Sequence, residues 1–524
     1  MDIMPELDIV LDFLIPERPG HVLAKKYIQP DGSSARIWIA TSMIDRLYAA
    51  AMDEGEKRDA NRAELTAAFS AFMSHVSILT VTAQSARDIL SYEHFGGDLA
   101  FRNFKRVAPN GIILTSSEGP NRYPNAVSLA QFAAGQCVQE SPSIPMLDLR
   151  EEYRFMIEDI DESVLQCIAD TRYILGPVVT ALEKRIGEYL GVKHCIGLSS
   201  GTDALVVALR ALAIIRKGEE YFSREDEILT TPLTFTATGD AILRAGATPV
   251  FLDIDPRTFN LDPSKIKDYL TRSPGSVVGV IPVHLYGQAC PMDDIMALAS
   301  ERGLFVLEDV AQAFGGSFKG KKLGSIGTGG AFSFFPSKNL GSFGDGGMVA
   351  SDDVAFAELV RMLTKHGGKD KYNVDHIGYN ARLDTIQAAI VLAKMKYVDF
   401  FNTRRRQLAG QYEDGLQGIQ GLILPTADED HVFHQYTVRV PGGRRDGLQK
   451  HLQSLGIGSM IYYPLPLHKM KVFENRMKIP EPVQHAEAAC AEVLSLPMEP
   501  LQSREATDCV IQSICNFFKG SASC

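Results

Sequence analysis

From residue 144 onward, short apolar runs alternate along the chain with stretches whose apolar residues recur at helical spacing. The strand-like runs are 195–198, 227–230, 248–252, 277–283 and 304–307. Helical patterns separate them, most clearly at 204–214 and 291–300. Continuous apolar strands between amphipathic helices predict an α/β fold, with a mostly parallel sheet covered by helices.

The pattern differs on either side of this region. Before it, apolar runs alternate with amphipathic stretches such as 62–75, which predicts a small α/β lobe over residues 1–143. Its strand-like runs are 36–40, 76–81 and 111–114. The turn-rich segment 116–125 and a linker at 139–145 separate this lobe from the large domain. No catalytic motif is found in the lobe, and solvated acids explain Asp8, Asp12 and Asp45 better than a metal site does.

The parallel-sheet pattern weakens after residue 397. A basic helix containing Arg404, Arg405 and Arg406 precedes a tail with mixed signals. We therefore expect a large domain over 144–397 and a smaller C-terminal subdomain over 398–524.

Composition narrows the function classes. The net charge of -11 provides no basic excess for neutralising phosphates, which argues against nucleic-acid binding. The eight cysteines include no CxxC pair, so we expect reduced thiols in a cytoplasmic protein. The first residues lack a basic, apolar leader, and no apolar run is long enough to span a bilayer. No membrane partner and no metal are therefore expected.

Lys338 and Asp309 are the leading candidates for chemistry. Lys338 follows the aromatic and small residues of 331–337, where partial burial would favour a neutral, nucleophilic amine. Asp309 closes the apolar run 304–308 and suits a fixed charge facing a positive ring nitrogen. Pyridoxal phosphate requires both groups, a lysine for the Schiff base and an acid that keeps the pyridinium protonated. A surface lysine and a loop aspartate are the alternative for this pair taken alone.

The segment 199–205 follows a strand-like run and opens a helical pattern. Ser200 and Asp203 have the spacing of a capping box, and Gly201 lets a ligand approach the backbone closely. Free N–H groups at such a helix start bind anions. A capped helix without a ligand is an equal alternative. The run 327–330 superficially matches a dinucleotide loop but lacks its full spacing and its later acid.

Two further strand ends carry candidate side chains. Phe235 follows the strand that ends near residue 231, where it could stack on a planar cofactor or simply pack in the core. His284 and Tyr286 lie at the end of the run 277–283, the edge at which open parallel sheets bind ligands. His284 is a catalytic candidate, although a lone histidine is usually structural.

Seven segments occur in an order that matches one protein family. They are 199–205, 234–238, 308–313, 332–341, 378–382, 462–468 and 494–498. From about residue 144 onward, the chain resembles the DegT/DnrJ/EryC1/StrS family of pyridoxal-phosphate sugar aminotransferases. The resemblance implies an aspartate-aminotransferase-like domain of fold type I followed by a small α+β subdomain. The first 143 residues lie outside it, and a second enzyme, a docking module and a lid are all open for them.

The resemblance also implies residue roles. Lys338 would form the Schiff base and move the proton, Asp309 would pair with the pyridine nitrogen, and Gln312 would lie near the phenolic oxygen. The implied cofactor-binding residues are Gly201, Thr202, Asp203 through its backbone, Phe235, Asp309, Gln312, Ser333, Lys338 and, from the neighbouring subunit of a homodimer, Asn380. The substrate-binding candidates are Tyr286, Tyr463 and His468.

The implied reaction is transfer of an amino group from glutamate to a keto-sugar carried on a nucleoside diphosphate. The segments 282–288 and 371–380 are most similar to enzymes acting on 3-keto sugars, which points to C3. Some relatives carry histidine in place of the lysine and are dehydratases, whereas Lys338 favours transamination. A dehydratase and a non-catalytic regulatory or binding protein are the alternatives.

Overall fold

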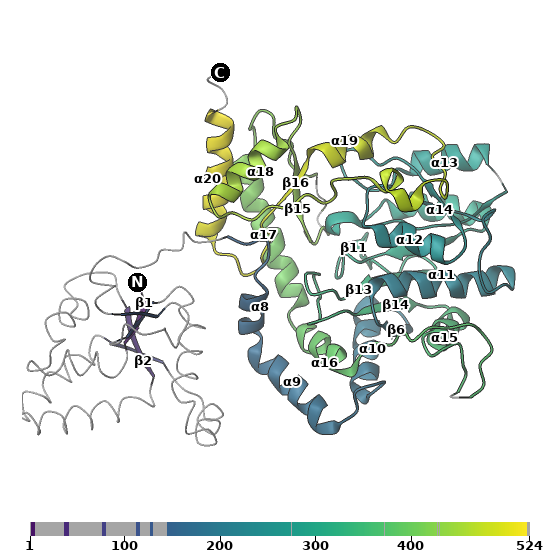
Figure 1. Cartoon of the computed structure of the whole chain (residues 1–524), viewed down its shortest axis with the longest axis horizontal. Helices are drawn as coiled ribbons and strands as arrows, with labels where there is room; N and C mark the ends of the chain where they lie inside the picture. The colour runs from purple at the N-terminus through teal and green to yellow at the C-terminus, as the bar shows by residue number, and fades with distance from the viewer. Residues whose placement is uncertain are drawn as a thin grey trace, which may run out of the picture. The chain divides into compact units, whose positions relative to one another are not determined.

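The structure, a computed structural model, describes residues 144–520 except 274, 371, 427 and 429, together with five strands nearer the N-terminus. The chain divides into two compact units, Met1–Glu140 and Ser141–Cys524, each with its own sheet (Figure 1). The helix expected over 62–75, the turn-rich segment 116–125 and the acids Asp8, Asp12 and Asp45 lie outside the described residues.

The sheet of the N-terminal unit is parallel throughout, in the order β3-β2-β1-β4-β5. Its strands are β1 (Asp2–Pro5), β2 (Arg36–Ala40), β3 (Val76–Leu79), β4 (Ile112–Thr115) and β5 (Ala126–Ser128). β2, β3 and β4 coincide with the three predicted apolar runs. A parallel sheet agrees with the strands expected for the lobe, and its α/β class stays a prediction.

The second unit is built around a seven-stranded sheet in the order β6-β14-β13-β10-β9-β7-β8. Only β14 runs antiparallel to its neighbours. The strands are β6 (His194–Leu198), β7 (Glu227–Thr230), β8 (Thr248–Phe251), β9 (Val277–Val280), β10 (Phe305–Asp309), β13 (Gly329–Ser333) and β14 (Gly347–Ser351). The five predicted strands are confirmed, and the mostly parallel α/β class with them. The strands β13 and β14 were not predicted.

Glycines explain why β13 escaped prediction. A Cβ atom on Gly330 would lie 2.4 Å from the Cα of Gly324, so a side chain there would displace the backbone. Gly329 and Gly330 therefore belong to a tightly packed strand. This agrees with setting aside the dinucleotide-loop interpretation of 327–330.

Alternating strand residues divide the core into two layers. In β10, Phe305 and Leu307 face the layer with α11, α12 and α15, whereas Val306 faces the opposite side. α10 and α16 cover that opposite side of β6, β13 and β14, and α13 and α14 cover it near β9 and β10. The helices of this part are α8 (Leu149–Phe155), α9 (Ile157–Asp170), α10 (Pro177–Leu190), α11 (Gly201–Lys217), α12 (Thr236–Arg244), α13 (Pro263–Arg272), α14 (Met292–Arg302), α15 (Val354–Leu363) and α16 (Thr385–Lys394).

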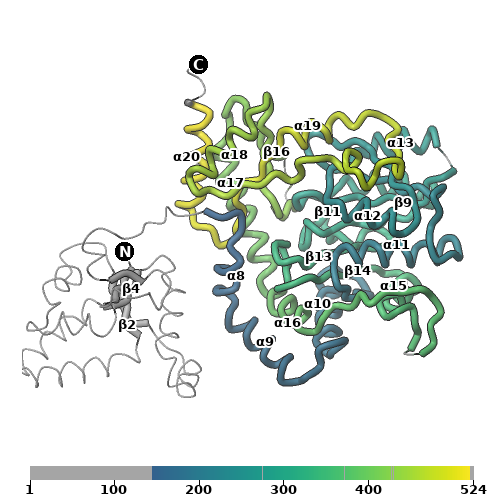
Figure 2. The backbone as a smooth tube through the Cα atoms, in the orientation of Figure 1, coloured from purple at the N-terminus to yellow at the C-terminus, as the bar shows by residue number. Residues whose placement is uncertain are grey.

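The C-terminal elements have their own apolar cluster. α17 (Val398–Leu416) packs against α20 (Arg504–Gly520), with α18 (Arg445–Ser454) and the antiparallel strands β15 (Tyr436–Arg439) and β16 (Val493–Leu496) beside them (Figure 2). The remaining elements are α19 (Gln484–Glu492), the short strands β11 (Ser317–Phe318) and β12 (Lys321–Lys322), and the short 3₁₀ helices η1 (Leu285–Gly287), η2 (Leu467–Lys469) and η3 (Lys471–Phe473). In the described part, no helix is both long and apolar enough to cross a membrane, and no cluster of three potential metal ligands occurs.

Candidate active site

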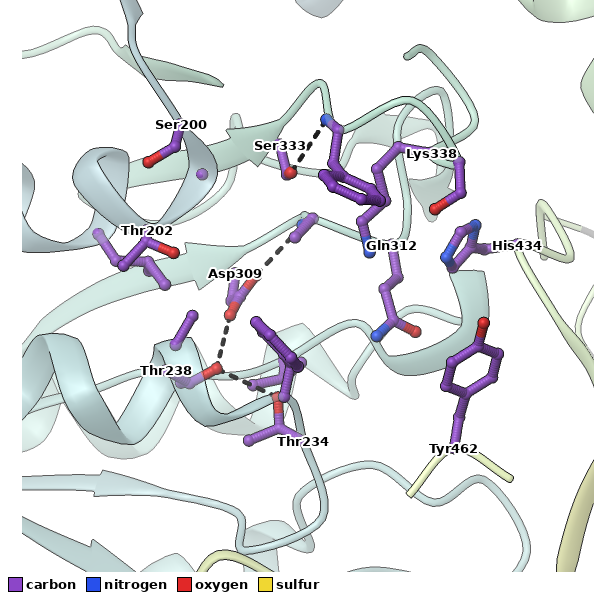
Figure 3. Close-up of a pocket in the computed structure, with 18 of the residues that line it drawn as sticks. Ser200, Thr202, Thr234, Thr238, Asp309, Gln312, Ser333, Lys338, His434 and Tyr462 are labelled. Atoms are coloured by element: carbon purple, nitrogen blue, oxygen red, sulfur yellow. Dashed lines mark hydrogen bonds between the residues drawn. The ribbon is translucent and has the colours of Figure 1, made fainter. Parts of the chain in front are cut away.

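A cavity of about 460 Å³ opens at the carboxyl edge of the large sheet. Its walls come from the ends of β7, β9, β10 and β13 and from the start of α11 (Figure 3). This is the edge at which open α/β sheets bind ligands. The predicted site residues that line it are Gly201, Thr202, Phe235, Asp309, Gln312, Ser333, Lys338 and Tyr463.

Lys338 lies on a loop that folds back after β13. The loop is closed by Lys338 N donating to Phe335 O (2.9 Å) and Ser342 N donating to Phe334 O (2.7 Å). Burial lowers the pKa of Lys338 to about 8, although the nearby Asp309 carboxylate acts in the opposite direction. At pH 8 about half of such amines are neutral, against roughly one in three hundred for a lysine of ordinary pKa. Lys338 is therefore a nucleophile close to neutral pH.

Asp309 is the last residue of β10 and is almost completely buried. Its Oδ2 accepts a hydrogen bond from Thr238 Oγ1 (2.8 Å), and its Oδ1 accepts one from Ala311 N (3.2 Å). Burial raises the pKa of Asp309, while these two bonds and the charge of Lys338 partly offset that rise. A buried carboxylate held in this way is suited to pair with a cationic ligand group.

The N-terminus of α11 forms one end of the cavity. Ser200 caps the helix by accepting a hydrogen bond from Asp203 N (3.0 Å). A Cβ atom on Gly201 would lie 2.6 Å from the Cβ of Ser333, so only glycine lets these two segments meet. With the hydroxyls of Ser200, Thr202 and Ser333 beside a helix start, this end is suited to bind a phosphate.

Gln312 connects the sheet to the C-terminal part of the cavity wall. Its Oε1 accepts from Tyr286 N (2.9 Å), and its Nε2 donates to Tyr463 Oη (2.9 Å). The Tyr286 ring is buried, with its hydroxyl donating to the carbonyl of Tyr462, so its side chain does not reach the cavity. Phe235 is 55% exposed, and its ring centre lies 6.2 Å from that of Tyr463. It therefore has a free face toward the cavity rather than a core position.

His284 does not line the cavity, although sequence reasoning made it a catalytic candidate. It is fully buried, and its backbone N donates to Asp309 O (3.1 Å). Its Nδ1 accepts from Cys290 N (3.0 Å), so its Nε2 carries the proton and donates to Glu308 Oε2 (3.1 Å). Both ring nitrogens are used, which places His284 behind the acid instead of at the reacting atoms.

Three other predicted residues also lie outside the cavity lining. The backbone N–H of Asp203, expected at the phosphate, is bonded to Ser200 within the helix cap. His468, expected at the substrate, places its Nε2 2.9 Å from Glu487. Asn380 is exposed on the loop before α16, outside the cavity of its own chain.

The lining includes further residues that were not among the predicted catalytic, cofactor-binding or substrate-binding residues. They are Ser200, Leu205, Thr234, Ala237, Thr238, Val283, Ala311, Phe335, Ser337, Asp345, His434, Gln435 and Tyr462. The segment 234–238, which carries part of the family resemblance, offered a signal for Thr234 and Thr238. No sequence pattern pointed to His434 or Gln435, which reach the cavity from beyond the large domain.

Comparison with known proteins gives a consistent result. Residues 155–515 match the DegT/DnrJ/EryC1/StrS aminotransferase family. A UDP-N-acetyl-3-dehydro-alpha-D-glucosamine 3-aminotransferase of Acidithiobacillus ferrooxidans is 42% identical over 363 residues, covering 69% of this chain and 94% of that protein. A pleiotropic regulatory protein of Geobacillus stearothermophilus is 42% identical over 381 residues, covering 72% of this chain and 99% of that protein.

Solved structures agree. S. venezuelae DesV, in complex with a ketimine intermediate, has a TM-score of 0.68 and 35% identity, covering 72% of this chain and 99% of that chain. Bacillus subtilis NtdA, with bound PMP cofactor, has a TM-score of 0.65 and 30% identity, covering 72% of this chain and 85% of that chain.

The cavity fits pyridoxal phosphate. It combines a half-buried amine of lowered pKa, a buried acid on the neighbouring strand and an anion-binding helix start. Fold and site therefore define a pyridoxal-phosphate-dependent aminotransferase. The chain belongs to the DegT/DnrJ/EryC1/StrS family, and its residues 1–154 precede the matched region.

Proposed function

We propose that this enzyme transfers the amino group of an amino acid, glutamate in the first instance, to a keto-sugar carried on a nucleoside diphosphate. The observation that carries the proposal is the half-buried Lys338, whose pKa is lowered to about 8 and which lies in the same cavity as the buried Asp309. The names of several relatives, which refer to 3-amino or 3-oxo sugars, support C3 as the position. Glycan or antibiotic-sugar synthesis is the corresponding role. The described cysteines are all unpaired, which supports a cytoplasmic location.

Bound pyridoxal phosphate would supply an electron sink that makes the donor's α-carbon acidic. The chain's own groups would do the rest. Lys338 would move the proton, Asp309 would hold a cationic ring nitrogen, and the α11 start with Thr202 and Ser333 would bind the phosphate. The amide of Gln312 is held in place from both sides and would orient an oxygen near the ring.

The direct test is a pair of half-reactions on the cofactor-loaded protein. Glutamate alone should change the visible absorption spectrum of the bound cofactor. A nucleotide-linked 3-keto sugar should then restore the original spectrum, with release of an aminosugar. The names of two relatives as a regulatory protein and a sensory transduction protein keep a non-catalytic role as the second candidate. A protein that binds the cofactor but does not respond to glutamate would favour that second candidate.

We further propose a homodimer in which Asn380 completes the phosphate site of the partner subunit. Asn380 is exposed, and its loop is firmly held because the buried Arg210 donates to Tyr379 Oη (2.8 Å) and Ile377 O (3.1 Å). Exposed apolar side chains surround this stretch, among them Ile174 on the segment paired with Asp384. Exposed apolar patches mark interaction surfaces, which supports placing a subunit interface here.

Mixing two inactive variants tests this arrangement. Lys338→Ala and Asn380→Ala homodimers should each be strongly impaired. In a mixed dimer, one site contains both defects and the other neither, so activity should return toward about a quarter of the wild-type value after random subunit exchange. Size-exclusion chromatography with light scattering checks the dimer itself. Failure of mixing to restore activity, despite proven exchange, would place Asn380 in its own chain's site or in none.

A further inference from the structure

The loop that carries Lys338, residues 334–342, is held from behind by a residue that does not line the cavity. We call it the lysine loop. Asn339, which directly follows Lys338, is buried, and its Nδ2 donates to the Oδ1 of Asn402 (2.8 Å). Asn402 is also buried and lies near the start of α17. The neighbour of the candidate nucleophile is therefore tied to a residue 63 positions away in the chain.

The same carboxamide reaches the segment that follows the acid. Asn402 Nδ2 donates to the carbonyl of Phe314 (3.1 Å), and Phe314 belongs to the short segment that begins at Asp309 and carries Gln312. The contact is close, because a Cβ atom on Gly315 would lie 2.5 Å from Asn402 Nδ2. One buried side chain thus joins the lysine loop to the segment that carries the acid.

α17 gives this bridge a fixed support. Near the start of the helix, Val398 belongs to the same apolar cluster as Leu340 of the lysine loop. Further along, Leu408 and Tyr412 belong to the apolar cluster of the C-terminal elements. A helix packed into two close-packed cores cannot shift without disturbing both of them. The carboxamide of Asn402 is therefore held in one place.

The sheet alone does not set the position of Lys338 relative to Asp309. The last paired residues of β10 and β13 are Asp309 and Ala331, and β13 ends at Ser333. Lys338 lies beyond that end, on the lysine loop. Its amine and the acid must meet the same planar cofactor, so their separation has to be set by contacts outside the sheet. The bridge through Asn402 is such a contact.

We propose that Asn402, acting through Asn339, is a positioning residue that sets the location of the Lys338 amine relative to Asp309. This inference rests on the roles proposed above for Lys338 and Asp309, and it gives Asn402 no contact with cofactor or substrate. Loss of the bridge would loosen the lysine loop and admit water around the amine. Burial is the main cause of the lowered pKa of Lys338, and Asp309 acts in the opposite direction. Hydration should therefore raise this pKa toward its ordinary value.

The pH dependence of Lys338 acylation in the cofactor-free enzyme tests the proposal. Acetic anhydride modifies only the neutral amine, and mass spectrometry of the Lys338 peptide measures the rate at each pH. The midpoint should lie near pH 8 in wild type, and it should rise by about one pH unit in Asn402→Leu and in Asn339→Leu. The other titratable groups that line the cavity are unchanged in both variants; they are Asp309, Asp345, His434, Tyr462 and Tyr463.

A double-mutant cycle separates the bridge from a general loosening of the fold. If Asn339 and Asn402 act through their shared hydrogen bond, the double variant should show no larger rise than the stronger single variant. Rises that simply add would mean that the two residues act independently, and the proposal would be wrong. If Asn402→Leu does not fold, Asn339→Leu, which leaves α17 intact, carries the same prediction.

Gln502→Leu is the matched control. Gln502 is another buried carboxamide beside α17, but its Nε2 donates to Thr507 Oγ1 (2.9 Å) and Tyr412 Oη (3.5 Å), both in C-terminal elements. Its loss should lower the melting temperature without moving the Lys338 midpoint. An unchanged midpoint in the folded asparagine variants, or an equal rise in Gln502→Leu, would overturn the proposal. A wild-type Lys338 that titrates near pH 8 but forms no bond with pyridoxal phosphate would instead contradict the proposed function.

Discussion

Lys338→Ala should lower the rate of amino transfer by at least about 10⁴-fold while the protein remains folded. The reason is positional, because Lys338 is the only amine among the described residues that line the cavity. No other group there is both a nucleophile toward a carbonyl and a base near neutral pH. Stopped-flow spectroscopy of the glutamate half-reaction measures the loss, and circular dichroism checks the fold.

Two comparisons sharpen this result. Lys338→Arg should be equally inactive, because a guanidinium stays protonated and forms no imine. Lys394 is a buried lysine, paired with Glu152, that does not line the cavity. Lys394→Ala should destabilise the fold yet keep the visible absorbance of the bound cofactor. Full activity in Lys338→Ala would remove the basis for the cofactor assignment.

The lowered pKa of Lys338 gives a pH dependence with a defined sign. Only the neutral amine attacks the cofactor's aldehyde, so capture by cofactor-free enzyme should speed up with pH and level off above about pH 8. An ordinary lysine would still be gaining rate at pH 10.

Asp309→Asn should slow the glutamate half-reaction by roughly 10²-fold or more while leaving part of the cofactor affinity. An amide cannot balance the charge of a pyridinium nitrogen, and the loss is large because the site is shielded from water. Thr238→Val keeps the acid and removes only the 2.8 Å hydrogen bond to it, so its effect should be much smaller.

Asp309→Asn should also shift the pH dependence of cofactor capture by Lys338. The carboxylate of Asp309 raises the pKa of Lys338, so its removal should move the midpoint of cofactor capture to lower pH. If the rate and the midpoint both remain unchanged, a different acid serves the ring. Glu308 is not that acid, because its carboxylate accepts from Gly324 N, Ile326 N and Gly327 N behind the strand.

The α/β class was readable from the sequence because central parallel strands are buried on both faces. Five of the seven strands of the large sheet therefore stand out as continuous apolar runs. β13 begins with two glycines that pack closely against Gly324 and a neighbouring helix, so it has too little apolar side chain to be noticed. β14 likewise begins with a glycine and ends with a serine.

The site divides in the same way between local and distant information. Lys338, Asp309 and the α11 start could be selected from sequence, because each combines a chemical group with a strand or helix end that is visible locally. His284 also combines a chemical group with a strand end that is visible in the sequence. In the structure, however, its imidazole hydrogen bonds to Glu308 behind the cavity. The pairing of β10 with β9 and β13 decides toward which face of the sheet a side chain at a strand end points. Spacing along the chain does not encode this pairing.

The sequence by itself determined the fold class, the lysine–acid pair and the anion-binding helix start, since these depend on apolar periodicity and local spacing. Only the tertiary structure decided that His284 and His468 lie outside the cavity and that His434 and Gln435 lie within it. The positions of His434 and Gln435 follow from packing between segments far apart in the chain, where Asn339 and the turn at Gly287 hold the 432–435 segment against the lysine loop. Long-range contacts of that kind are selected by shape and hydrogen bonding in the folded core, and they leave no periodic mark in the chain.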